Sequence, residues 1–216
     1  MVRTRNFALP GGYPARDATT YRGFREALAA SACSLCPLSA GRAHIVVDRG
    51  DPSARVMAIG EAPGAEEDRE GRAFVGRAGR LLDELLVESG LDPDHDLLIA
   101  NVVKCRPPDN RPPHAEEARR CLPFLRRQIE LVRPRIIVLL GRTALKHMLP
   151  GEPARRLDGL VGKFFRRPEY AGLDLMVLFH PAYVLRNPAS RQAMLRGLAA
   201  LRKRIAEVVR EGISYN

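Results

Sequence analysis

The chain has 216 residues, with 35 lysines and arginines against 25 aspartates and glutamates, which gives a formal net charge of +10. This length fits one domain with a full hydrophobic core, and the excess of positive charge favours an anionic partner such as nucleic acid, unless it only reflects an arginine-rich proteome. No run of about 18 apolar residues occurs, so we expect no transmembrane helix, and residues 1–30 have no apolar stretch typical of an export signal.

Strand-like and helix-like segments alternate along the chain, after residues 1–30, which are predicted to form a basic arm with a short helix. Short apolar runs bounded by turn residues predict buried strands, and apolar residues repeating every three to four positions predict helices. The predicted strands cover residues 45–47, 55–59, 97–103, 136–140 and 175–179. The predicted helices cover a segment around Leu81–Leu86 that Gly90 stops, and then residues 114–132, 143–149 and 190–209. The proline-rich residues 106–113 must form a loop.

This alternation is typical of a parallel or mostly parallel sheet with helices on both faces. No repeat or low-complexity linker divides the chain, so residues 31–216 are predicted to form one domain after the arm. Ligands of such sheets bind at the carboxyl ends of the strands. Those ends carry an acid at Glu61, an amide at Asn101 and an imidazole at His180. We therefore expect a binding site where these three side chains meet.

The first of these strand ends leads into the sequence GEAPGAEED over residues 60–68. Its glycines and proline hold the backbone tightly and let a ligand approach main-chain N–H groups. Taken alone, the segment is also explained as a solvated acidic turn. Phe74, which follows it, is either an ordinary core aromatic or a platform on which a base stacks.

Asn101 interrupts an otherwise apolar strand. A buried amide costs roughly 1–3 kcal/mol unless its donor and acceptor are paired, so either the protein or a ligand must satisfy it. An amide offers one acceptor and one donor side by side. This pattern matches N3–H and O4 of uracil, whereas cytosine presents the opposite polarity.

A lone histidine after a strand is more often a structural residue than a catalytic one. A functional role for His180 is therefore supported only by the other two polar residues at the predicted site. It opens the segment HPAYVLRNP over residues 180–188. Within that segment, Val184, Leu185 and Arg186 are suited to an apolar wedge with a cationic flank that opens a duplex from the minor groove.

The four cysteines of the chain are the pair Cys33 and Cys36, in a C-x-x-C motif, and the separate Cys105 and Cys121. We expect them to form one four-thiolate metal site. A structural zinc site usually gathers two close pairs, so one pair with two isolated thiolates favours a [4Fe–4S] cluster over zinc. Buried structural thiols and two disulfides are the alternatives, and a reducing cytosol argues against disulfides.

Taken together, these segments resemble the iron–sulfur uracil-DNA glycosylases, the family 4 branch of the uracil-DNA glycosylase superfamily. The resemblance extends from about Cys33 to the end of the last predicted helix. It rests on GEAPGAEED at 60–68, GRAFVG at 71–76, NVVKCRPPDNRPP at 101–113, LLG at 139–141 and HPAYVLRNP at 180–188. It implies a three-layer α/β/α sandwich around a central four-stranded parallel sheet, with a structural [4Fe–4S] cluster on the four cysteines near the DNA-binding face.

The resemblance also implies roles for the site residues. In catalysis, Glu61 would activate water or stabilise a cationic sugar with Asp68 as a supporting carboxylate, while His180 and the N–H groups near Gly60 and Ala62 would stabilise the departing base.

For recognition of the base, the resemblance implies that Phe74 stacks on a flipped uracil and that Asn101 reads its pairing edge. Glu67 would lie near C5 of the base and help to exclude the methyl group of thymine. His180 would hydrogen-bond the O2 side.

The implied activity is hydrolysis of the N-glycosidic bond of uracil in single- or double-stranded DNA, which leaves an abasic site. One branch of the superfamily forms a covalent adduct through a basic insert after the third strand. Here the corresponding strand, predicted at 136–140, runs directly into GRTAL at 141–145. No lysine is proposed as a nucleophile either, so we expect neither covalent trapping nor strand cleavage.

We expect a monomer in a bacterial or archaeal cytoplasm, acting at the nucleoid. Two rival functions stay open at this point. One is a module that binds uracil in DNA without turnover, and the other is a zinc-containing α/β hydrolase that acts on nucleotides.

Overall fold

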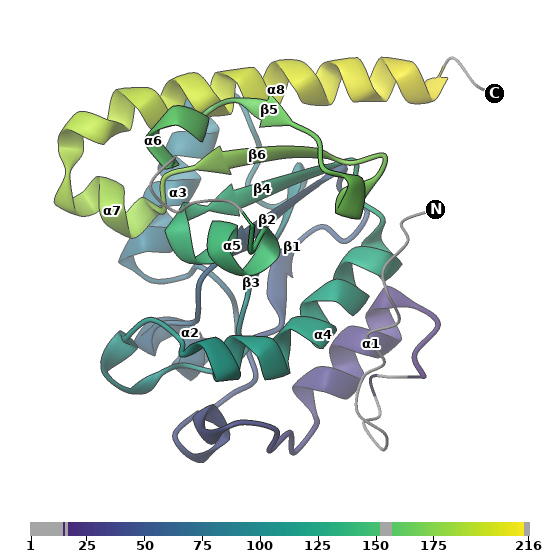
Figure 1. The fold of residues 1–216 in the computed structure, drawn as a ribbon, viewed down its shortest axis with the longest axis vertical. Helices are drawn as coiled ribbons and strands as arrows, with labels where there is room; N and C mark the ends of the chain where they lie inside the picture. Colours follow the sequence, from purple (N-terminus) through teal and green to yellow (C-terminus); the bar gives the residue numbers. More distant parts are fainter. Residues whose placement is uncertain (1–14, 16, 152–156, 214–216) are drawn as a thin grey trace.

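The computed structural model describes residues 15, 17–151 and 157–213. Its centre is a six-stranded sheet with the strand order β1-β3-β2-β4-β6-β5 (Figure 1). The four inner strands run parallel: β2 (Val56–Gly60), β3 (Leu97–Asn101), β4 (Ile136–Leu140) and β6 (Asp174–Leu178). The outer strands β1 (Asp48–Gly50) and β5 (Phe164–Phe165) are antiparallel to their neighbours. The α/β class is confirmed, but the predicted four-stranded sheet is only the inner part of a wider one.

Helices cover both faces of this sheet, which gives the expected three layers (Figure 1). Alternate residues of a strand point to opposite faces, and Met57 and Ile59 accordingly belong to a different hydrophobic cluster from Val56 and Ala58. The first cluster includes side chains of α1 (Tyr21–Ala29), α4 (Ala115–Val132) and α5 (Gly141–Met148). The second includes side chains of α3 (Arg77–Glu88), α7 (Pro181–Arg186) and α8 (Arg191–Ile213).

Short elements account for most differences from the predicted secondary structure. The first strand lies at Asp48–Gly50 instead of 45–47, and β5 was not predicted because it is only two residues long. Two segments expected as loops contain helices, namely α2 (Ala65–Glu70) and α7, where Pro181 has the fixed φ that suits a first turn. A further short helix, α6, spans Leu157–Leu160. No helix in the described part of the chain is both long and apolar enough to cross a membrane.

The short helix predicted near the N-terminus is α1. Its Phe24 and Leu28 are buried and pack in the same cluster as residues of α4 and the sheet. Residues 1–14 of the predicted arm lie outside the described residues. The division of the chain at residue 30 stays a prediction.

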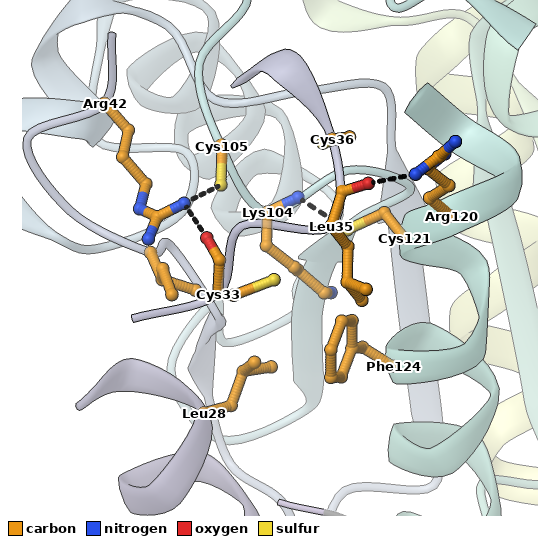
Figure 2. A pocket seen from close by; sticks show the side chains of 11 residues that line it. Leu28, Cys33, Leu35, Cys36, Arg42, Lys104, Cys105, Arg120, Cys121 and Phe124 are labelled. Atoms are coloured by element: carbon orange, nitrogen blue, oxygen red, sulfur yellow. Dashed lines mark hydrogen bonds between the residues drawn. The ribbon is translucent and has the colours of Figure 1, made fainter. Parts of the chain in front are cut away.

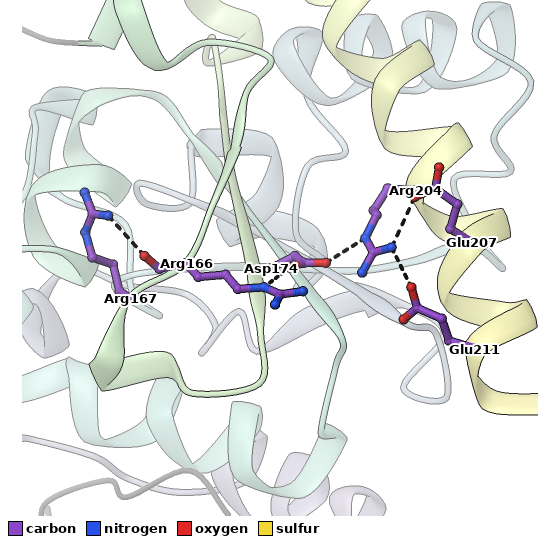
Figure 3. Close-up of polar contacts among 6 residues, drawn as sticks. All are labelled: Arg166, Arg167, Asp174, Arg204, Glu207 and Glu211. Atoms are coloured by element: carbon purple, nitrogen blue, oxygen red, sulfur yellow. Dashed lines mark hydrogen bonds and ion pairs between the residues drawn. The ribbon is translucent and has the colours of Figure 1, made fainter. Parts of the chain in front are cut away.

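A buried carboxylate at the start of β6 connects the sheet to α8 (Figure 3). Asp174 accepts hydrogen bonds of 2.7 Å from both Arg166 Nε and Arg204 Nε, and Arg204 also pairs with Glu207 and Glu211 of its own helix. Burial alone would raise the pKa of Asp174, but the two arginine hydrogen bonds outweigh it and lower the pKa. The ionised form is therefore the one that stabilises the fold.

We expect Asp174→Asn to lower the free energy of unfolding by about 1–3 kcal/mol at neutral pH, because two charge-assisted hydrogen bonds are weakened. A carboxyl pKa that is lower in the folded state contributes stability that is full above the unfolded pKa and lost as the pH falls through the folded one. Urea unfolding should therefore show a difference that is full above about pH 5 and shrinks in more acidic solution. Asp94→Asn, at an exposed carboxylate, is the matched control, and an equal loss in both variants would contradict the assignment.

Candidate active site

The carboxyl ends of β2, β3, β4 and β6 open into one large cleft with about 2070 Å³ of atom-free space that includes open solvent. The cleft brings together most of the side chains selected from the sequence. Its lining includes Glu61, Ala62, Glu67, Phe74, Asn101, His180 and Arg186. The predicted meeting point of acid, amide and imidazole therefore exists in the fold.

Asn101 ends β3 and is only 1% exposed. Its Oδ1 is buried and has no hydrogen-bond partner among the described residues. The neighbouring position in the sheet register is Gly60. A Cβ at Gly60 would lie 2.4 Å from the Phe74 ring and 2.5 Å from Asn101 Oδ1, so only glycine leaves room for both. The amide thus offers an unpaired acceptor inside a tightly packed corner of the cleft.

Phe74 lines the same corner in an uncommon backbone conformation, with φ of 54°. A bulky residue rarely adopts a positive φ, and such strain persists only where the surroundings hold it. Gly79 of α3 packs directly on the Phe74 carbonyl and would clash with it if it carried a Cβ. The Phe74 ring lies 5.7 Å from the His180 ring, centroid to centroid. An aromatic face and an imidazole therefore border the buried amide.

His180 caps the N-terminus of α7 through its Nδ1, which accepts the N–H of Ala182 at 3.2 Å. The proton of the neutral ring then sits on Nε2, which is left as a donor. Burial, together with the charge of Arg186, lowers the pKa of His180 to about 4. At neutral pH the cleft contains an uncharged imidazole. Gly141, at φ of 85°, lies against the Cβ of His180, so a side chain at position 141 would clash with it.

Glu61 is partly buried at the end of β2 and accepts a hydrogen bond from the hydroxyl of Thr143. Thr143 stands in the first turn of α5, just after β4, and also lines the cleft. Thr143 was not selected from the sequence, although its place directly after the strand predicted at 136–140 was a usable signal. One carboxylate oxygen of Glu61 is thereby oriented by the protein.

The two carboxylates that follow Glu61 in the acidic motif bind backbone amides. Glu67 is 9% exposed and accepts from Gly64 N at 3.0 Å and Gly76 N at 2.7 Å, so it joins α2 to the segment before α3 while still lining the cleft. Asp68 is not among the residues that line the cleft. It accepts from Ala43 N and His44 N, at 3.0 and 3.2 Å. In the structure it holds the segment that leads to β1.

The three residues proposed as a DNA wedge differ in exposure. Val184 is 3% exposed and packs in the second hydrophobic cluster, so its side chain is part of the core and not of an exposed wedge. Leu185 is 39% exposed and Arg186 is exposed. Tyr183, which the sequence analysis did not select, is 40% exposed on the same short helix. The exposed surface of α7 therefore carries an aromatic, an aliphatic and a cationic side chain.

Arginines surround the mouth of the cleft. Arg77, Arg142 and Arg186 are exposed and line it. Arg111 lines it as well but forms a bidentate pair with the buried Glu117 of α4, with N–O distances of 2.7 and 2.8 Å. This pair fixes the proline-rich loop to α4. The positive rim suits a polyanionic ligand.

The four cysteines gather around a second cavity, which has about 330 Å³ of atom-free space (Figure 2). Cys33 and Cys36 precede β1, Cys105 follows β3, and Cys121 lies in α4. All four are free thiols. Within the described residues, no three or more His, Cys, Asp or Glu side chains stand close enough to hold one metal ion. Four thiols that border one cavity fit the shared four-thiolate metal site predicted from the sequence.

The surroundings of these thiols also suit an iron–sulfur cluster. Leu28, Leu35, Ile45 and Phe124 make the wall apolar. Two N–H donors point at sulfur, with Arg42 Nη1 at 3.6 Å from Cys105 Sγ and Lys104 N at 3.3 Å from Cys121 Sγ (Figure 2). Such donors stabilise metal-bound thiolates.

The buried thiols are not activated as nucleophiles. Burial raises the pKa of Cys105 to about 11 and that of Cys121 to about 12. A thiol with such a pKa is protonated at neutral pH, and the thiolate is the reactive form.

Comparison with known proteins agrees with this geometry. The family model described as the uracil DNA glycosylase superfamily matches residues 47–202. The chain belongs to this superfamily. A type-4 uracil-DNA glycosylase of Thermotoga maritima is 45% identical over 162 residues, which cover 72% of this chain and 79% of the relative. One of Pyrobaculum aerophilum is 44% identical over 170 residues, covering 77% and 86%. A type-5 uracil-DNA glycosylase of Thermus thermophilus is 37% identical over 150 residues, covering 55% and 68%.

We expect an NMR titration of the histidine rings to give His180 a pKa of about 4, with the neutral ring protonated on Nε2. His95 is the internal control, because it is exposed and its hydrogen bond to Asp92 raises its pKa. An ordinary His180 pKa near 6.5, or a proton on Nδ1, would contradict the geometry of this superfamily member's cleft.

Proposed function

We propose that this chain hydrolyses the N-glycosidic bond between uracil and deoxyribose in DNA. The C1′–N1 bond breaks, water supplies a hydroxyl group to C1′, and uracil leaves with the remaining proton. The observation that carries the proposal is the buried Asn101 amide, whose Oδ1 lacks a partner among the described residues and lies beside an aromatic ring and a neutral imidazole. The names of the type-4 relatives support the same substrate.

Recognition requires that the base leave the helix stack, because the cleft cannot otherwise reach it. Flipping costs a few kcal/mol, which stacking on Phe74 and pairing with Asn101 offset. Asn101 Oδ1 accepts the N3–H of uracil, and Nδ2 donates to O4. Cytosine would place an acceptor against Oδ1 and a donor against Nδ2, so the amide rejects it. Glu67, held by two loop amides, fills the space beside C5 and disfavours thymine.

Bond cleavage leaves negative charge on the base, and the cleft supplies donors for it. The Nε2–H of His180 donates to uracil O2, and the N–H groups near Gly60 and Ala62 add to this stabilisation. Donors that are already in place gain strength as the charge develops, which lowers the barrier. Because His180 is neutral, it donates a hydrogen bond without carrying a charge of its own.

The sugar becomes cationic as the base departs, and Glu61 is the carboxylate that lines the cleft beside it. Thr143 orients one of its oxygens, which leaves the other to position the attacking water. Asp68 acts at a distance, by holding the segment before β1. The exposed Arg77 and Arg142 bind DNA phosphates at the cleft. Leu185, which is exposed on α7, enters the stack at the vacated position, with Arg186 as its cationic flank.

The proposal includes a [4Fe–4S] cluster held by Cys33, Cys36, Cys105 and Cys121. When bound, the cluster supplies a structural crosslink between the N-terminal segment, the loop after β3 and α4. Action as a monomer at the nucleoid of a bacterial or archaeal cell stays a prediction from the sequence.

The activity is tested with an oligonucleotide that carries one uracil, incubated with the protein and then cleaved by alkali at any abasic site. We expect cleavage at the uracil position and none in a strand with thymine there. A purified protein with its metal centre intact that leaves the uracil strand uncut would overturn the proposal.

We expect Asn101→Asp to lower the excision rate by about 100-fold or more, because a carboxylate presents only acceptors to O4 of uracil. The same alkali assay measures the rate. Thermal melting and binding to an abasic oligonucleotide serve as controls and should change little. Wild-type rates in this variant would rule out edge reading by Asn101.

We expect Cys105→Ser to give a pale, poorly soluble protein, because the loop after β3 loses its attachment to the metal centre. The measurement is the iron, sulfide and zinc content per chain, with visible absorbance. Wild-type protein should contain iron and sulfide without stoichiometric zinc. A soluble Cys105→Ser protein with unchanged iron and sulfide would reject this ligand assignment.

A further inference from the structure

Lys104 is buried between the cleft and the cysteine cavity. It is 1% exposed and is among the largest fully buried side chains of the described residues. Lysine is seldom buried completely, because an ammonium group loses its hydration unless the protein replaces it. The mechanism proposed above gives this side chain no role, although it lies three residues from Asn101 and next to Cys105.

The ammonium group of Lys104 has a complete set of acceptors. Nζ donates to Asn101 O at 2.9 Å, to Val47 O at 3.3 Å and to Gln128 Oε1. An ammonium group has three N–H donors, and each one has a partner here. The network continues to the buried carboxylate of Asp48 through Gln128, whose Nε2 donates to Asp48 Oδ2 at 3.2 Å. A buried cation is thereby tolerated within a polar network.

The backbone of the same residue contacts the cysteine site. Lys104 N donates to Cys121 Sγ at 3.3 Å, and Lys104 O accepts from Val46 N at 2.8 Å. The side chain then turns back and bonds the carbonyl three residues earlier. Residues 101–104 thus form a closed turn between the cleft and the cysteine cavity.

No hydrogen bond to its own acceptor orients the Asn101 amide. Its Oδ1 has no partner among the described residues, so no hydrogen bond at that atom fixes the side chain before a base arrives. The direction of the amide is therefore set by the Asn101 backbone and by packing against Gly60. Lys104 is the side chain that hydrogen-bonds this backbone at its carbonyl.

We propose that Lys104 is a positioning residue for base recognition, which fixes the Asn101 backbone through its ammonium–carbonyl hydrogen bond and so aims the amide at uracil. The inference rests on the proposed function and extends it to a residue that does not touch the base. If this is right, loss of the ammonium group weakens uracil recognition only where Asn101 is present to be displaced.

A double-mutant cycle tests this role, with Lys104→Met, Asn101→Ala and the combined variant. Methionine keeps most of the apolar stem but has no donor. A displaced recognition group can cost about 10–100-fold, so we expect Lys104→Met to lower kcat/KM for uracil excision by that factor. The same change in the Asn101→Ala background should cost less than about threefold, because residues that act as one unit are not additive. Free uracil should also inhibit Lys104→Met more weakly, by a factor similar to the kcat/KM loss.

Lys163→Met is the matched control, since Lys163 is exposed, and it should keep wild-type kcat/KM and uracil inhibition. Equal losses from Lys104→Met in the wild-type and Asn101→Ala backgrounds would show a general structural role and overturn the inference. Uracil excision by the wild type would still leave the proposed function intact. A wild-type protein without uracil release would overturn both.

A second variant covers the case in which Lys104→Met does not fold. Lys104→Met combined with Gln128→Leu removes the buried donor together with its side-chain acceptor, so no Gln128 oxygen is left unpaired, while Asp48 keeps Tyr21 and Arg25 as partners. We expect this protein to fold with a melting temperature below that of the wild type, and still to lose uracil inhibition. Wild-type inhibition by uracil in this folded variant would overturn the inference.

Discussion

An amide oxygen without a partner, buried where β3 ends, is the constraint around which the candidate site is built. Leaving a polar atom unsatisfied inside a protein costs roughly 1–3 kcal/mol. Asn101 therefore carries a penalty that a ligand with a matching donor removes. The parallel sheet supplies the place for such an arrangement, because the ends of its inner strands meet at one edge. Glu61, Asn101 and His180 come from three different strand ends and line one cleft for this reason.

Close packing fixes the positions of the Asn101, Phe74 and His180 side chains in the cleft. Gly60 leaves room for the Phe74 ring and the Asn101 amide at the same time, and Gly141 leaves room for His180. Phe74 has a positive φ, and its carbonyl packs on Gly79 of α3. The site therefore depends on the absence of side chains at two positions as much as on the chemistry of the groups that contact a base.

The sequence predicted the inner strands and the polar residues at their ends, because apolar runs and the residues that follow them are local signals. It did not predict β5, which is too short to have a period. It also did not predict the helices α2 and α7, because Gly64 directly precedes α2 and Pro181 is the first residue of α7. Burial was harder to predict. Val184 packs in the core, and Asp68 binds the amides of Ala43 and His44, which lie about 25 positions earlier in the chain. Partners so distant in sequence, such as Thr143 for Glu61, are fixed only by tertiary structure.

The part of the chain that the superfamily model matches is smaller than the part that folds together. The superfamily match begins at residue 47, after Cys33 and Cys36 and after the whole of α1. Yet Leu28 of α1 forms part of the wall around the cysteines, and Phe24 is completely buried. A fragment cut at the limit of the match would lack two of the four sulfurs and expose the other two to water and oxygen. An expression fragment for this protein should therefore begin before Tyr21.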